Sequence, residues 1–214
     1  MFMEFSVIIP AHNEELYIEK TLSSIPKSVE SIVVCNGCTD STEKIAKKYA
    51  KVISISEKSV SKARNLGAKN SSGKILIFLD ADTYFTSEKA FREIEKTLKN
   101  SVVGTCKSIP DSKSLKAAFV IIFKNLFLWT HWTSGIIFCK KETFDNVQGF
   151  NENLTKKEDR DFVNKCLEHG NFGIANCYVV NSMRRYEKYG YFKLPLYWIK
   201  ESIFKSKKDY PVVR

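Results

Sequence analysis

Two aspartates, Asp80 and Asp82, stand one residue apart directly after five consecutive apolar residues at 75–79. Carboxylate oxygens suit a hard divalent cation, and Mg²⁺ usually takes one or two carboxylates together with substrate phosphates and water. Two acids in a loop are more often simply solvated, so the spacing alone is weak evidence. Their position at the end of an apolar run strengthens the prediction of a metal site.

Two cysteines, Cys35 and Cys38, form a C-x-x-C sequence at a predicted strand-to-helix turn. A thioredoxin-like redox pair occupies such a turn, so a thiol oxidoreductase is one hypothesis for the function. The flanking residues lack the usual Trp and Pro, and the two aspartates would have no task in that chemistry. A zinc site is disfavoured, because no second paired motif completes four ligands.

Short predicted strands and helices alternate along the chain and would place these residues at one edge of a sheet. The strand at 75–79 is apolar at every position, as in strands buried on both faces of a parallel sheet. This alternation is typical of a single α/β domain of Rossmann type, with a mostly parallel central sheet flanked by helices. Ligands bind such sheets beyond the carboxyl ends of the strands. The predicted strands are 5–10, 31–35, 52–55, 75–79, 102–106, 134–139 and 172–180.

The predicted helices carry start and stop signals of their own. Asn13 is expected to cap a helix that runs to about residue 24, and Asp40 is expected to form a capping box with Glu43. The segment 115–129 is apolar on nearly every side, which indicates a core element, a partner interface or a membrane surface, and we expect a core element. The other predicted helices are 41–49, 59–69, 87–98, 158–169 and 191–205.

The 214-residue chain is basic, with 34 Lys and Arg against 24 Asp and Glu and a formal net charge of +10. Such a chain favours an anionic partner: nucleic acid, an anionic membrane surface or phosphorylated small molecules. Nucleic acid is disfavoured, because no block of five or six like charges occurs and an RNA-binding domain would rest on charge alone. The lack of a signal peptide and six irregularly spaced cysteines predict reduced thiols in the cytoplasm. No segment reaches the roughly 18 to 20 apolar residues that span a bilayer.

Four stretches together resemble the inverting glycosyltransferases of family 2, which have the GT-A fold. The first is Val7-Ile-Ile-Pro-Ala-His-Asn-Glu-Glu15, and the second is Ile-Val-Val-Cys-Asn-Gly-Cys-Thr-Asp-Ser-Thr at 32–42. The third is Lys-Ala-Arg-Asn-Leu-Gly at 62–67, followed by 73–83 with its Asp-x-Asp. The fourth combines Ser-Gly at 134–135, Gly-Phe at 149–150 and Lys-Glu-Asp-Arg-Asp at 157–161. Each motif is weak alone, but four in the family's order, over residues 5 to about 170, make a strong resemblance.

The resemblance implies a metal-dependent, inverting transfer of a sugar from a nucleoside-diphosphate sugar to an acceptor hydroxyl or lipid phosphate. Mg²⁺ or Mn²⁺ would neutralise the charge that develops on the leaving diphosphate. Asp82 would coordinate this metal, and Asp80 would contact the ribose or a metal-bound water. Asp159, in the family's Glu-Asp motif, would be the base that takes the acceptor proton, with Glu158 as the alternative. Acids are favoured in the first turn of any helix, so this role depends on the upstream motifs.

The same resemblance assigns a set of residues to the nucleotide sugar. Here the chain departs from the family pattern, because Cys35 and Asn36 replace two acids. Only the Asn36 side-chain carbonyl could accept the ring N–H of a base, so the identity of the base stays open. Arg184 and Arg185 are expected to close over the diphosphate. The expected donor-site residues are Pro10, Ala11, His12, Glu14, Asn36, Arg64, Asp80 and Ala81, with Arg64 as the cation for the diphosphate.

We expect one domain over residues 1–214, with a nucleotide-sugar half at 1–105, an acceptor half at 106–180 and an aromatic, basic, helical tail at 181–214. The tail and the apolar 115–129 segment would suit an anionic membrane surface, and hence a lipid-linked acceptor at the inner face of the cell membrane. The sugar, the acceptor and the oligomeric state stay open. A nucleotidyltransferase of related fold, which would release pyrophosphate, is a further alternative.

Overall fold

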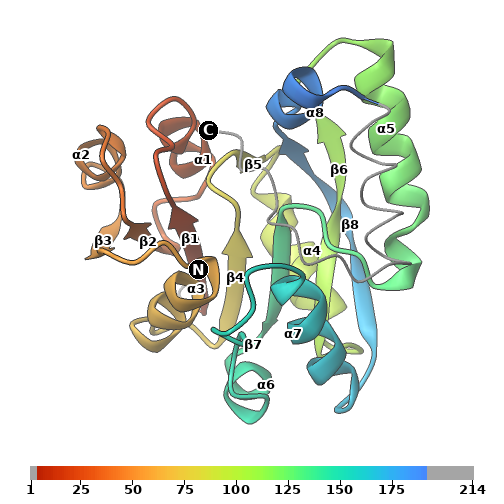
Figure 1. Cartoon of the computed structure of the whole chain (residues 1–214). Helices are drawn as coiled ribbons and strands as arrows, with labels where there is room; N and C mark the ends of the chain where they lie inside the picture. Colours follow the sequence, from red (N-terminus) through yellow and green to blue (C-terminus); the bar gives the residue numbers. More distant parts are fainter. Residues whose placement is uncertain (1–3, 192–214) are drawn as a thin grey trace.

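An eight-stranded mixed sheet runs through the middle of the protein, whose computed structural model describes residues 4–191 (Figure 1). The strands lie in the order β3-β2-β1-β4-β7-β6-β8-β5. The predicted α/β domain with a mostly parallel sheet is confirmed, although β5 and β7 run antiparallel to their neighbours. The strands are β1 Phe5–Ala11, β2 Glu30–Asn36, β3 Lys51–Ile55, β4 Ile75–Leu79, β5 Thr83–Phe85, β6 Val103–Pro110, β7 Ile136–Lys140 and β8 Phe172–Asn181.

Four parallel strands form the half of the sheet that carries the first three motifs. β1 pairs with β2 on one side and with β4 on the other, and β2 pairs with β3. Every residue of β1 and β4 is buried, as expected for strands that are covered on both faces. The carboxyl ends of these strands therefore meet at one edge, where the polar turns begin.

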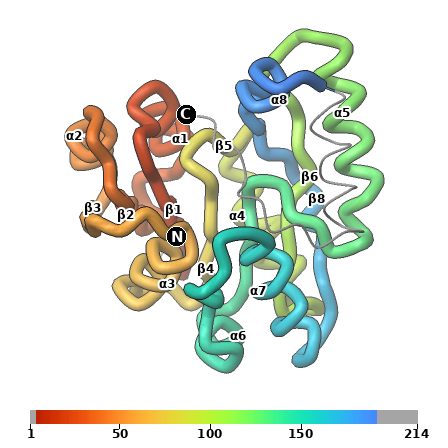
Figure 2. Tube along the Cα trace, viewed as in Figure 1, coloured from red at the N-terminus to blue at the C-terminus, as the bar shows by residue number. Residues whose placement is uncertain are grey.

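Helices cover both faces of the sheet (Figure 2). On one face α3 packs so closely on β1 that a Cβ at Gly67 would lie 2.3 Å from the Ile8 side chain. Only glycine therefore permits this approach. The helices are α1 Ile18–Ser23, α2 Thr42–Ala46, α3 Val60–Lys69, α4 Lys89–Thr97, α5 Leu115–Leu126, α6 Lys141–Asn146, α7 Glu158–Leu167 and α8 Arg184–Tyr189, with a 3₁₀ turn at Leu128–Thr130.

Strand β7 enters the sheet between β4 and β6 and runs antiparallel to both. Its insertion brings Gly135 beside the end of β4, where the Asp80 N–H donates to the Gly135 carbonyl at 2.9 Å. β6 and β8 pair in parallel, with a shift in register between Cys106 and Lys107. The strand predicted at 102–106 is thus longer than expected and continues to residue 110.

Two predicted helix starts are wrong. α1 begins later than expected, and Asn13 has a φ of 55° and binds Thr39 through its side chain. Instead of capping a helix, the Asn13 side chain connects the turn after β1 to the turn after β2 through this hydrogen bond. Glu43 pairs with Lys47 at 2.6 Å instead of reaching back to Asp40, so no capping box forms at α2.

Helix α5 is not the core element that its composition predicts. Only its Ala117, Val120 and Ile121 stripe is buried, in a small cluster with Met183 beside α8. The other apolar side chains form the outer face of α5: Leu115, Phe119, Ile122, Phe123 and Leu126, with Phe127 and Trp129 just beyond the helix. Within residues 4–191 no helix is long and apolar enough to cross a membrane. The helix predicted at 191–205 falls outside the described residues, apart from its first.

Candidate active site

Asp80 and Asp82 stand on the turn between β4 and β5, where the apolar strand leaves the sheet. A hydrogen bond from the Thr83 N–H to the Asp80 carbonyl closes this turn at 3.0 Å. Gly135 lies against it with a φ of 72°, and a Cβ there would lie 2.5 Å from Thr83 Oγ1, so glycine is required. The Asp80 side chain is 40% exposed and that of Asp82 is 14% exposed. Both carboxylates therefore remain partly open to a ligand.

Arg64 of α3 joins this aspartate turn to the start of α7. Its guanidinium lies 3.2 Å from Asp80, 3.5 Å from Glu158 and in still closer contact with Asp159. Arg64 is only 4% exposed, and it lies 5.0 Å from the centre of the Phe150 ring. It is therefore the counter-charge that brings together acids distant in the sequence. Its contact with a diphosphate stays a prediction.

Asn65, the next residue of α3, holds the turn that precedes α7. Its Oδ1 accepts from the Phe150 N–H and its Nδ2 donates to the Phe150 carbonyl, both at 2.9 Å. The Asn65 side-chain amide thus makes the same two hydrogen bonds to the Phe150 backbone that a neighbouring strand would make. Consecutive residues of α3 therefore fix both the position of the 149–150 turn and the charges at the start of α7.

Burial raises the pKa of both acids at the start of α7. The pKa of Glu158 rises to about 7, chiefly through burial and then through the charge of Asp159, while Arg64 opposes the rise. Burial also raises the pKa of Asp159, against the opposing charge of Arg64. A desolvated carboxylate that stays beside a cation is a good proton acceptor at neutral pH. A general-base role for either acid stays a prediction.

Arg184, at the start of α8, contacts the second aspartate of the turn. Its Nη2 lies 2.7 Å from Glu14 Oε1 and 2.9 Å from Asp82 Oδ2, and its guanidinium stacks 4.4 Å from the centre of the Tyr17 ring. The other Glu14 oxygen is buried and has no hydrogen-bond partner among residues 4–191. Arg184 therefore contacts two carboxylates, those of Glu14 and Asp82. Its closure over a diphosphate stays a prediction.

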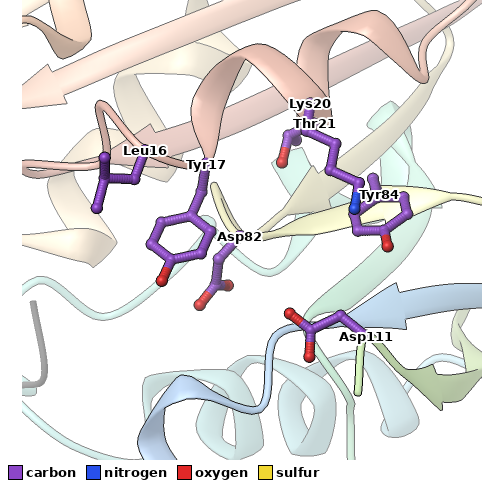
Figure 3. A pocket seen from close by; sticks show the side chains of 7 residues that line it. All are labelled: Leu16, Tyr17, Lys20, Thr21, Asp82, Tyr84 and Asp111. Carbon is purple, nitrogen blue, oxygen red and sulfur yellow. The ribbon is translucent and has the colours of Figure 1, made fainter. Parts of the chain in front are cut away.

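A pocket of about 200 Å³ opens beside Asp82 (Figure 3). Tyr17 and Thr21 line it, and the Thr21 hydroxyl donates to the carbonyl of Ala81 at 2.7 Å. This volume is below the roughly 300–1,000 Å³ of pockets that enclose drug-sized ligands, so the pocket alone would not hold a nucleotide sugar. Tyr17 and Thr21 were not among the site residues predicted from the sequence. They are four residues apart, a spacing that places two side chains on the same face of a helix, and this spacing could have indicated that they lie together.

The residues predicted to hold the nucleotide lie at the ends of β1 and β2. Pro10 and Ala11 are buried as the last residues of β1, and His12 Nδ1 lies 2.7 Å from the Asn36 carbonyl oxygen. Asn36 is 3% exposed, and its side-chain oxygen has no hydrogen-bond partner within residues 4–191. An unpaired buried acceptor is costly, so Asn36 is suited to accept an N–H from a ligand. Their roles in nucleotide binding stay predictions.

Asp80 and Asp82 fit a divalent cation that takes its remaining ligands from a substrate. Among residues 4–191, no three His, Cys, Asp or Glu side chains form a metal cage. Two carboxylates together with phosphate oxygens are the usual Mg²⁺ arrangement at phosphate sites. The Glu14 and Asp82 carboxylates lie close enough for their charges to repel, and one Glu14 oxygen has no hydrogen-bond partner within residues 4–191. A cation at this position would relieve that repulsion.

Cys35 and Cys38 lie in hydrogen-bonding contact at the end of β2. Cys38 Sγ also donates to the Ala11 carbonyl at 3.3 Å. The hydrogen bond between the thiols lowers the pKa of Cys38 to about 7 and raises that of Cys35. Cys38 is partly exposed and Cys35 is buried. Cys38 is therefore the accessible thiol of the pair.

Comparison with known proteins gives one family. The model of glycosyl transferase family 2 matches residues 6–150 of this chain. Poly(ribitol-phosphate) beta-N-acetylglucosaminyltransferase TarS of Staphylococcus aureus is 33% identical over 99 residues, which cover 40% of this chain and 17% of TarS.

The solved structures that resemble this chain are also glycosyltransferases. A crystal structure of a fragment of S. aureus TarS in complex with UDP-GlcNAc aligns with a TM-score of 0.67 and 25% identity, covering 84% of this chain and 58% of the fragment. The mannosyltransferase PcManGT of Pyrobaculum calidifontis, in complex with GDP-Man and Mn²⁺, aligns with a TM-score of 0.69 and 17% identity. That alignment covers 97% of this chain and 66% of PcManGT, and it shows a likeness of fold alone. The chain spans less than two thirds of the length of each of these relatives.

Proposed function

Since this chain belongs to glycosyl transferase family 2 and is a glycosyltransferase of GT-A type, we propose that it transfers a sugar from a nucleoside-diphosphate sugar with inversion. The observation that carries the proposal is the contact of Arg64 with both Asp80 and Asp159. One buried guanidinium thereby holds a donor-side aspartate and the candidate base together. The anomeric carbon and the acceptor would meet between them.

The donor would lie across the carboxyl ends of β1, β2 and β4. Asn36 would accept the ring N–H of the base through its unpaired side-chain oxygen, and Pro10, Ala11 and His12 would frame the ribose. The relatives bind a UDP-sugar and a GDP-sugar respectively, so uridine and guanosine diphosphates are the first nucleotides to test. Both bases present a ring N–H that suits a carbonyl acceptor.

Asp82 and Asp80 would hold Mg²⁺ or Mn²⁺, as the Mn²⁺ complex of PcManGT suggests. When bound, such an ion neutralises the charge that develops on the leaving diphosphate. Arg184 would stay beside the diphosphate after exchanging its contact with Asp82 for a phosphate oxygen. Arginine suits that exchange, because its planar donors match carboxylate and phosphate alike.

Asp159 would take the proton of the acceptor hydroxyl while the hydroxyl oxygen attacks the anomeric carbon. The bond from that carbon to the diphosphate oxygen breaks as the new bond forms on the opposite face, so the configuration inverts and a nucleoside diphosphate leaves. Arg64 favours the ionised form of Asp159 before the proton arrives. Glu158 is the alternative base. A lipid-phosphate acceptor is already anionic and would not need this proton transfer.

We propose further that the outer face of α5 contacts an anionic membrane surface. Its exposed apolar side chains include Phe119, which is 64% exposed, and Lys116 on the same helix is exposed as well. Apolar and basic side chains on one helix are typical of interfacial binding. The double variant Phe119→Ser/Leu126→Ser should sediment less with anionic vesicles at unchanged stability. Equal binding to anionic and neutral vesicles would contradict this proposal.

The donor proposal is tested by calorimetric titration of nucleoside diphosphates and their sugars, with Mn²⁺, with Mg²⁺ and with chelator. Asp82→Asn should weaken metal-dependent binding at least tenfold, whereas Asp145→Asn, at an exposed position of α6, should leave it unchanged. Release of a nucleoside diphosphate with an inverted sugar product would support the reaction. Release of pyrophosphate would favour a nucleotidyltransferase instead. If the protein bound no nucleotide under any of these conditions, the proposal would be refuted.

A further inference from the structure

Arg184 bridges two carboxylates that come from distant segments of the chain. Its Nη2 lies 2.7 Å from Glu14 Oε1, which follows β1, and 2.9 Å from Asp82 Oδ2, in the turn after β4. The two oxygens can therefore be no further apart than the sum of these distances, about 5.6 Å. Both acid side chains are mostly buried, and buried charges at such a separation need a cation between them. Here that cation is the Arg184 guanidinium.

The two acids are fixed by backbone hydrogen bonds that do not involve Arg184. The Glu14 N–H donates to Thr42 Oγ1 at 2.7 Å, and the Glu14 carbonyl accepts from two N–H groups at the beginning of α1, both at 2.9 Å. The Asp82 carbonyl accepts from the Ser182 N–H at 3.3 Å. The two carboxylates would therefore stay beside each other if the guanidinium moved away.

Arg184 is the member of this cluster that is free to move. It begins α8, a helix of six residues none of which is buried, so little core packing would be lost if the residue shifted. Its guanidinium stacks 4.4 Å from the centre of the Tyr17 ring, which lies beside the Asp82 carboxylate (Figure 3). The Arg184 Nε has no hydrogen-bond partner within residues 4–191. A guanidinium with an unused donor suits an exchange from carboxylate to phosphate, because its planar donors match both anions.

The bridge to Arg184 leaves Glu14 only partly satisfied. The second carboxylate oxygen of Glu14 is buried and has no hydrogen-bond partner in the described part of the chain, 4–191. A buried anionic oxygen without a donor is costly, and a divalent cation brings twice the charge of a guanidinium to such a group. Asp80 is less available to a cation than Glu14 is, because Arg64 contacts Asp80 at 3.2 Å. Glu14 is therefore a better second partner for a cation at Asp82.

We propose that Glu14 binds the divalent cation together with Asp82, and that Arg184 occupies this cation position until the diphosphate of the donor draws its guanidinium away. The inference rests on the proposed function, because it requires a nucleoside diphosphate at this edge of the sheet. The cation and the diphosphate then bind cooperatively. The diphosphate accepts the guanidinium that competes with the cation, and the cation neutralises the carboxylates that the guanidinium leaves.

The test measures Mn²⁺ binding by electron paramagnetic resonance, which follows the free ion and needs no turnover. Without nucleotide, Arg184→Met should bind Mn²⁺ about fivefold or more tightly than the wild type, because the competing cation is gone. Arg185→Met removes a neighbouring charge that also acts on Glu14 and Asp82, and at high salt it should tighten binding less than about twofold. Uridine or guanosine diphosphate should tighten Mn²⁺ binding more in the wild type than in Arg184→Met.

The second ligand is tested by Glu14→Gln, an experiment that does not depend on whether Arg184→Met folds. In protein saturated with nucleoside diphosphate, Glu14→Gln should weaken Mn²⁺ binding about tenfold or more, since even the loss of an outer-shell partner costs that much. Glu15→Gln should have no effect, because the exposed Glu15 carboxylate accepts from the Ser41 N–H instead. With chelator present, Glu14→Gln should not weaken nucleotide binding, because Glu14 acts on the nucleotide only through the cation.

Several results would overturn the proposal and leave the proposed glycosyl transfer standing. Mn²⁺ affinity that Arg184→Met leaves unchanged, or that Arg185→Met raises equally, would show that Arg184 does not occupy the cation position. Weaker nucleotide binding by Glu14→Gln in chelator, with unchanged Mn²⁺ affinity, would place Glu14 on the nucleotide. Wild-type protein that binds nucleotide but no Mn²⁺ would also overturn it. Wild-type protein that binds neither uridine nor guanosine diphosphate would instead reject the proposed function, and this inference with it.

Discussion

Replacing Arg64 by methionine should lower the free energy of unfolding by about 3–5 kcal/mol, because it leaves buried acids without their counter-charge. The guanidinium is 4% exposed and contacts Asp80, Glu158 and Asp159. The Asp80 side chain is 40% exposed and keeps much of its hydration, whereas that of Glu158 is 20% exposed. The Asp159 side chain, at 35%, is almost as exposed as that of Asp80, so the cost should come mainly from Glu158 and lie at the lower end, about 3 kcal/mol.

The pH dependence of this cost identifies its origin. Methionine retains much of the aliphatic packing of arginine, so the loss should be electrostatic and should shrink at pH 5, where the uncompensated carboxyls take up protons. The assay is urea unfolding followed by circular dichroism at pH 5 and pH 8. Arg64→Lys, which keeps the charge but loses the planar fork, should recover only part of the loss.

A double-mutant cycle tests whether Asp159 is the partner of Arg64. Adding Asp159→Asn to Arg64→Met should restore about 1 kcal/mol or more of the free energy of unfolding. The second change removes a carboxylate that the first leaves without its counter-charge, so the two effects are not additive. A loss below about 1 kcal/mol in Arg64→Met, or strict additivity in the cycle, would refute Arg64 as the counter-charge of the acid pair.

Three further outcomes are expected. The raised pKa of Glu158, about 7 against 4.5, means that the folded state binds this proton more tightly than the unfolded chain, so the free energy of unfolding should fall as pH rises from about 4.5 to 7. Urea unfolding across that range should show a smaller fall in Glu158→Gln, and an unchanged slope would contradict the assignment. Gly67→Ala should cost about 1–3 kcal/mol in the same assay, because its Cβ would meet Ile8 at 2.3 Å; a neutral effect would mean that α3 can move away from β1. Cys38 should be the cysteine that iodoacetamide alkylates fastest at pH 7, because its pKa is lowered to about 7 and it is partly exposed; peptide mass mapping that finds another cysteine labelled first would contradict this.

The parallel half of the sheet was predictable because its signals are local. The apolar run at 75–79 and the polar turns after each strand are readable from short windows, and the structure places Asp80 and Asp82 at that strand end. The same local signals misplaced the start of α1, because Asn13 bonds to Thr39 in another turn. Such a contact between separate turns has no periodic signature.

The charge arrangement of the site could not be predicted, because it depends on contacts between distant segments. Arg64 resembles any helical surface arginine in the sequence, and only the fold shows that it is buried among acids. The direction of β7 is likewise absent from residue periodicity, although it brings Gly135 to Asp80. The exposed apolar face of α5 was not predictable from composition, because an apolar residue can lie in a core or on an exposed surface.

The side-by-side placement of Arg64 and Asn65 on α3 has a consequence for how such enzymes diversify. Asn65 grips the Phe150 backbone and Arg64 neutralises the acids that follow it, so neither half of the chain can be replaced without disturbing the other. We expect chimeras that join the first 105 residues to the remainder of a distant homologue to fold poorly unless both contacts are kept. Recombination at that boundary should therefore be rarely tolerated.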